Sequence, residues 1–104
     1  MSENLEIIAM EIIVHAGNAK AEAYDALKYA KKNDFIKVEE LLNNAEKENV
    51  EAHKIHLKLL GLQEGFKNIN EQLLVIHAMD TMMTTMSEIN LIGELIELYK
   101  EKVR

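Results

Sequence analysis

Apolar residues recur every three or four positions along nearly the whole chain, which is the spacing of an amphipathic α-helix. Two short breaks interrupt the pattern, one around Asp34 and one around Gly65. Asp34 suits a helix N-cap and Gly65 suits a helix end, and Asn68 with Glu71 has the spacing of a capping box. The pattern predicts an all-α fold with three helices, at residues 4–32, 35–63 and 69–102.

The third predicted helix differs from the first two because it carries two apolar stripes instead of one. The first stripe comprises Val75, Met79, Met82, Met86, Ile89, Gly93 and Ile96. The second stripe comprises Leu73, Ile76, Asp80, Met83, Ser87, Leu91, Leu95 and Leu98. A helix in a three-helix subunit buries one face against its neighbours. We therefore expect the first stripe to pack within the subunit and the second to pack against further copies of the chain.

The composition fits one small helical domain spanning residues 1–104. Proline is absent, and residues that favour helices dominate. The net charge of −6, without a basic cluster, disfavours a nucleic-acid partner. The absence of cysteine excludes disulfides, thiolate catalysis and cysteine-ligated zinc. The acidic N-terminus is unlike a signal peptide and the apolar runs are too short to span a membrane, so we expect a cytoplasmic protein.

One histidine and one carboxylate, His77 and Asp80, stand three positions apart in the apolar run of the third helix. Burying ionisable groups among apolar residues is costly, so both residues need an explanation. His77 begins a thin polar strip that continues with Thr81 and Thr84. An imidazole with a free ring nitrogen and nearby hydroxyl donors can accept a phosphoryl group. The same spacing also fits a core histidine that is hydrogen-bonded to a neighbour.

Asp80 lies on the stripe that we expect to face further copies of the chain. On a symmetry axis its copies would meet, and clustered carboxylates need a cation or shared protons. Mg²⁺ prefers such oxygen ligands, although an exposed or capped aspartate explains the spacing equally well. The other histidines give weaker signals. His15 fits the same polar strip or the core, and His53 with His56 fits a surface or an interface.

Residues 73–84 read L-L-V-I-H-A-M-D-T-M-M-T. This segment resembles the signature L-L-[VI]-H-A-Q-D-H-L-M-T of the lactose/cellobiose-type enzyme IIA components of the bacterial phosphoenolpyruvate:sugar phosphotransferase system, with one extra apolar residue before the histidine. Further matches to this family follow its order through nearly the whole chain, at residues 13–19, 30–35, 51–55 and 92–100.

The resemblance implies an antiparallel three-helix subunit that assembles as a homotrimer, in effect a nine-helix bundle. It implies that His77 takes phosphate from the carrier protein HPr and passes it to enzyme IIB. It also implies that three copies of Asp80 hold one metal ion, expected to be Mg²⁺, at the threefold axis. The transported sugar would be a β-linked disaccharide of the lactose, cellobiose or chitobiose class, which the membrane IIC component recognises.

Two residues depart from the family signature, since Met79 replaces its glutamine and Thr81 replaces its second histidine. Both neighbour His77, so Met79, Thr81 and Thr84 are the candidate supports for the phosphoryl group. Two other functions compete with the carrier role. One is a divergent, non-catalytic or regulatory helical interaction module. The other is a histidine phosphotransfer domain of two-component signalling, which usually has lysine and glycine just after its histidine.

Overall fold

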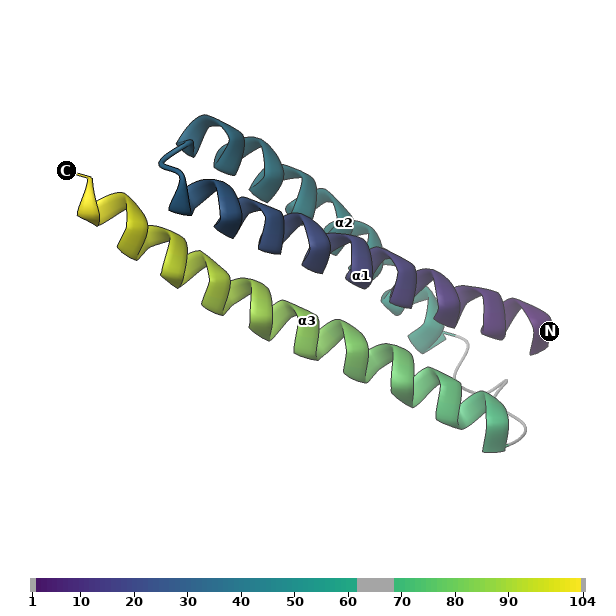
Figure 1. Ribbon diagram of the computed structural model, residues 1–104. Helices are drawn as coiled ribbons and strands as arrows, with labels where there is room; N and C mark the ends of the chain where they lie inside the picture. Colours follow the sequence, from purple (N-terminus) through teal and green to yellow (C-terminus); the bar gives the residue numbers. More distant parts are fainter. Residues whose placement is uncertain (1, 62–68, 104) are drawn as a thin grey trace.

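The chain folds into long helices that lie side by side (Figure 1). The computed structural model describes residues 2–61 and 69–103, with side chains from Leu5 onward. These residues form α1 (Ser2–Lys31), α2 (Phe35–Gly61) and α3 (Ile69–Lys102), and they contain no strand. The predicted all-α fold is confirmed. α1 and α3 run in the same direction and α2 runs against them, giving a molecule that measures 55 × 18 × 16 Å.

The turn between α1 and α2 follows from the residues of the first break. Asn33 adopts a left-handed conformation with φ of 62°, which asparagine tolerates better than most residues and which ends α1. Asp34 then caps α2, because its Oδ1 accepts a hydrogen bond of 3.2 Å from the backbone N–H of Lys37. The predicted N-cap is confirmed. The predicted helix end at Gly65 and the capping residue Asn68 lie outside the described residues.

α1 is the central helix of the subunit. Its apolar stripe is buried along the whole length, and its second half is rich in alanine, which lets the neighbouring helices approach closely. The buried residues of α1 are Leu5, Ala9, Ile12, Ala16, Ala19, Ala23, Ala26 and Ala30. The first three pack in one cluster with residues of α2 and α3, and the last three pack in a second cluster at the other end of the molecule.

The bundle is open between α2 and α3. α1 packs along both of its neighbours, whereas α2 and α3 touch each other at few points. A groove of about 460 Å³ lies between them, with Val50, His53 and Leu57 on the α2 side and Met86 and Asn90 on the α3 side. The antiparallel three-helix arrangement is therefore held together mainly by the contacts of α1. None of the described helices is both long enough and apolar enough to cross a membrane.

The two apolar stripes of α3 have different environments, as the sequence predicts. Val75, Met82 and Ile96 of the first stripe are buried against α1 and α2. The large apolar side chains of the second stripe point away from the subunit, and five of them are between 57% and 62% exposed: Leu73, Ile76, Met83, Leu91 and Leu98. A contiguous apolar stripe of this length on a surface marks an interaction site. The prediction that this face lies outside the subunit core is confirmed.

Candidate functional site

His77 lies on the surface of α3, about two turns after the helix begins. Its side chain is exposed, while the next residue, Ala78, is completely buried against the first core cluster. The helix backbone at this point is therefore anchored by packing, and the imidazole projects from a rigid base. The alternative of a histidine buried in the core of the subunit is wrong.

The three predicted supporting residues lie in different environments around His77. Thr84 is exposed, and its hydroxyl donates to the backbone oxygens of Asp80 at 2.9 Å and Thr81 at 3.2 Å. Thr81 is half-buried on the same side of α3 as His77. Met79 is also half-buried, but it packs against the first core cluster. The two threonines therefore share the histidine face, whereas Met79 points toward the core.

Asp80 is exposed on the outward stripe of α3, between Ile76 and Met83 along that stripe. Among the described residues of one chain, no group of three or more histidine, aspartate or glutamate side chains could hold a metal ion. One subunit therefore contributes one carboxylate at this position. Its chemistry is that of a hard oxygen ligand, which suits a divalent cation only where further copies of Asp80 join it.

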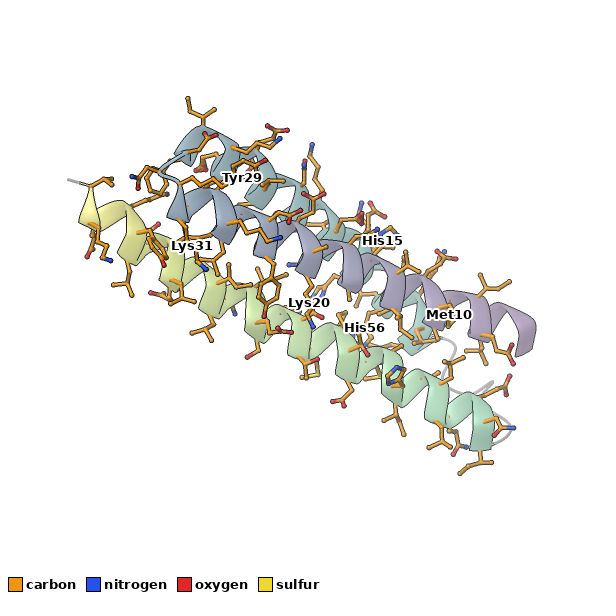
Figure 2. The ribbon with its side chains drawn as sticks, viewed as in Figure 1. Met10, His15, Lys20, Tyr29, Lys31 and His56 are labelled. Carbon is orange, nitrogen blue, oxygen red and sulfur yellow. The ribbon has the colours of Figure 1, made fainter. Side chains whose placement is uncertain are left out.

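A polar connection between α1 and α3 continues the histidine face three turns further along. Glu88 receives a hydrogen bond of 2.6 Å from the hydroxyl of Tyr24 and forms an ion pair of 3.2 Å with Lys20. The hydrogen bond from Tyr24, followed by that from Lys20, lowers the pKa of Glu88, and the same bond raises the pKa of Tyr24. Figure 2 shows Lys20 between α1 and α3. This connection links the exposed faces of α1 and α3.

A second polar connection joins α1 to α2. His15 Nδ1 lies 2.5 Å from Glu48 Oε2, and Asn18 donates to the other carboxylate oxygen at 3.1 Å. The hydrogen bond from His15 lowers the pKa of Glu48. His15 therefore lies against α2, as Figure 2 shows, and not on the polar strip of His77. The sequence predicted that His15 lies either on that strip or in the core. The structure places it at neither position.

His53 and His56 lie on α2, and neither takes part in the α1–α3 connection. His53 is exposed on the wall of the α2–α3 groove, and His56 is half-buried with its ring centroid 6.3 Å from that of His53. The prediction of a surface or interface position is confirmed for His53. Neither ring belongs to the His77 surface.

An exposed histidine on an open helix face suits one kind of chemistry better than others. A small substrate is normally enclosed in a pocket that buries most of its surface. His77 instead is open to solvent on the surface of α3, where another macromolecule can reach it.

Comparison with known proteins agrees with this geometry. Residues 7–100 match the family model of the lactose/cellobiose-specific IIA subunit of the phosphotransferase system. The chain is 36% identical to the N,N'-diacetylchitobiose-specific EIIA component of Escherichia coli over 96% of its length and 86% of that protein. It is 33% identical to the lichenan-specific enzyme IIA component of Bacillus subtilis, over 97% and 92% of the two chains. The crystal structure of the cellobiose-specific enzyme IIA from Bacillus anthracis superposes with a TM-score of 0.81 at 31% identity, covering 93% and 89% of the two chains.

Proposed function

Because this chain belongs to the lactose/cellobiose-specific IIA family of the phosphotransferase system and is therefore a phosphotransferase component, we propose that His77 is its phosphoryl carrier. His77 takes phosphate from phosphorylated HPr in the cytoplasm and passes it to enzyme IIB. The sugar that the system transports is a β-linked disaccharide of the lactose, cellobiose or chitobiose class. The observation that carries this proposal is the exposure of His77 on a rigid helix, at the histidine position of the family signature.

The transfer exchanges one phosphorus–nitrogen bond for another. A ring nitrogen of His77 attacks the phosphorus with its lone pair, and the bond from the phosphorus to the donor histidine breaks. The bonding electrons return to the donor ring, which leaves as neutral imidazole while the proton on the other nitrogen of each ring stays in place. Such a transfer depends mainly on positioning and on stabilising the charge of the phosphoryl oxygens.

The threonines on the histidine face supply hydroxyl donors for the phosphoryl oxygens in this proposal. Thr84 reaches them only if its hydroxyl rotates away from the carbonyls of Asp80 and Thr81. Thr81, which stands where the family signature has histidine, is nearer to His77 in the sequence than Thr84 is. Met79 acts through its packing against the core, because its side chain offers no strong donor.

The exposed stripe of α3 supports the second part of the proposal, a homotrimer with the α3 helices at its centre. Leu73, Ile76 and Met83 would be buried there, which removes a large apolar surface from water. Three copies of Asp80 would meet within this stripe and bind one divalent cation, expected to be Mg²⁺. The cation would offset the repulsion among the three carboxylates and so link assembly to metal.

Intact-mass measurement after incubation with phosphoenolpyruvate, enzyme I and HPr tests the carrier role. The native chain should gain one acid-labile phosphate, and His77→Ala should gain none. His53→Ala is the matched control, because it also removes an exposed histidine and should leave the phosphate unchanged. A folded native chain that takes no phosphate, beside an active IIA protein as positive control, would sink the carrier role and favour a regulatory interaction module.

A further inference from the structure

His53 and His56 are two histidines of α2 that the proposed carrier role does not use. They stand three positions apart, which makes them neighbours on one side of the helix. Their ring centroids lie 6.3 Å apart. Two nitrogens that bind one metal ion, each at about 2.0 Å, lie at most about 4 Å from each other. The ring separation permits this arrangement, because nitrogens that face each other lie closer together than the centroids of their rings.

One nitrogen of this pair is buried. The Nε2 atom of His56 is shielded from water and has no hydrogen-bond partner among the described residues, although the residue as a whole is only half-buried. Figure 2 shows His56 between the ribbons of α1 and α3. A buried polar atom without a partner is costly, and an ion or a water is the usual explanation. Imidazole nitrogen is also the commonest metal ligand in proteins, so a metal ion is a natural partner for this atom.

A methionine of α3 lies near the two histidines. His53 and Met86 line the same groove of about 460 Å³ between α2 and α3. Met86 also packs against the core cluster that contains Ala52 and Ile55, which directly precede the two histidines in the chain. The groove and the cluster therefore place the thioether of Met86 at the level of the histidine pair.

This set of ligands favours copper over the other common ions. In the part of the chain that the structure describes, no three histidine or carboxylate side chains come together as a zinc site would require. The chain has no cysteine, so the thioether of methionine is its only soft sulfur ligand. Imidazole suits zinc, copper, iron and nickel, whereas thioether sulfur selects monovalent copper. Copper is the ion that both kinds of ligand accept.

We propose that His53, His56 and Met86 form a binding site for one monovalent copper ion between α2 and α3. The two imidazole nitrogens and the thioether sulfur each donate a lone pair to the ion, and no electron is transferred. α2 and α3 otherwise touch at few points, so the bound ion joins the two helices on the open side of the bundle. The site is separate from Asp80, which is a hard oxygen ligand on the outward stripe of α3.

Anaerobic titration of the full chain with monovalent copper, in competition with the chromogenic chelator bathocuproine disulfonate, tests the proposal. One ion should bind per chain. Loss of an outer-shell partner of a metal ligand already weakens binding about 10–100-fold, so His53→Gln and His56→Gln, which remove a ligand itself, should each weaken it at least about 100-fold. Met86→Leu keeps the size of the side chain but removes its soft sulfur, and it should weaken copper binding at least about tenfold.

His77→Gln and Met83→Leu are the matched controls, because they change an exposed histidine and an exposed methionine of α3 outside the groove. Both should bind copper as the native chain does.

The melting temperature gives a second readout, since a ligand that binds only the folded chain stabilises it. Copper should raise the melting temperature of the native chain and of both controls, but not that of His53→Gln or Met86→Leu. Circular dichroism without copper shows that each variant is folded. The proposal is overturned if the native chain binds no copper or binds zinc more tightly. It is also overturned if His53→Gln or Met86→Leu binds copper as tightly as the native chain, or if a control variant loses it.

Discussion

Replacing Met83 by lysine separates the stability of the subunit from that of the assembly. Met83 lies on the outward stripe of α3, next to Asp80 along that stripe, and is 62% exposed. In an isolated subunit, a substitution at such a position changes the free energy of unfolding by no more than about 0.5 kcal/mol. In the proposed trimer the same position is an interface, and three lysines would meet there.

The expected loss follows from the area that assembly would bury. Complete burial of a methionine side chain stabilises by about 1.5–3 kcal/mol, and the exposed fraction leaves roughly 1–2 kcal/mol per copy to be gained on assembly. Three copies give about 3–6 kcal/mol per trimer, before any repulsion among the lysines. Since a factor of ten in a dissociation constant corresponds to about 1.4 kcal/mol, the variant trimer should dissociate at least about 100-fold more readily.

Sedimentation equilibrium over a dilution series measures this effect directly. The native chain should remain assembled at concentrations where Met83→Lys is monomeric. Ile36→Lys, a control at a position of α2 that is 88% exposed, should behave as the native chain does. The helical content of all three should be the same by circular dichroism. The reasoning is refuted if Met83→Lys assembles as tightly as the native chain, or if the native chain is monomeric throughout.

Three further predictions concern the core, the metal and one polar connection. Leu59 is 1% exposed, so Leu59→Ala should lower the free energy of unfolding by about 2–5 kcal/mol in urea denaturation, and a loss below 1 kcal/mol would contradict the described packing. If the proposed trimer binds a metal, chelator should lower the melting temperature of the native chain but not that of Asp80→Asn, and equal curves with and without chelator would exclude the metal. The hydrogen bond from His15 holds the pKa of Glu48 below its ordinary value of 4.5. The pair therefore contributes its full stabilisation of the folded chain above pH 4.5, and that contribution is lost as the pH falls through the lowered pKa. Glu48→Gln should therefore be less stable than the native chain at neutral pH, with a difference that shrinks in acid, and a difference independent of pH would rule this out.

The helical spacing of the apolar residues predicted most of the fold. Residues such as Ile12, Leu59 and Val75 repeat at helical spacing, and each is buried. The exposed apolar face of α3 was also predictable from this spacing, because a second stripe cannot be buried within so small a subunit. The opening between α2 and α3 was not predictable. A stripe shows which face of a helix is buried and leaves open which neighbour buries it.

The surroundings of His77 were only partly predictable. The face that His77 shares with Thr84 follows from helical spacing, whereas that spacing left open whether His77 is exposed or lies in the core. The connection of Glu88 to Tyr24 and Lys20 does not, because charged and polar residues on helix surfaces are common and their partners lie more than sixty positions away. The pair of His15 and Glu48, 33 positions apart, escaped prediction because such polar residues are equally common on helix surfaces. Only the arrangement of the helices decides which of many such residues meet.

The open side of the bundle has a consequence for how the chain behaves as it is diluted. α3 has α1 as its main neighbour within the subunit, and its second apolar stripe remains in water. If copies of the chain cover that stripe, folding and association are linked by mass action, and the midpoint of thermal unfolding rises with protein concentration. The helix that carries His77, the proposed phosphoryl carrier, would then be the part of the subunit that depends most on its neighbours for stability.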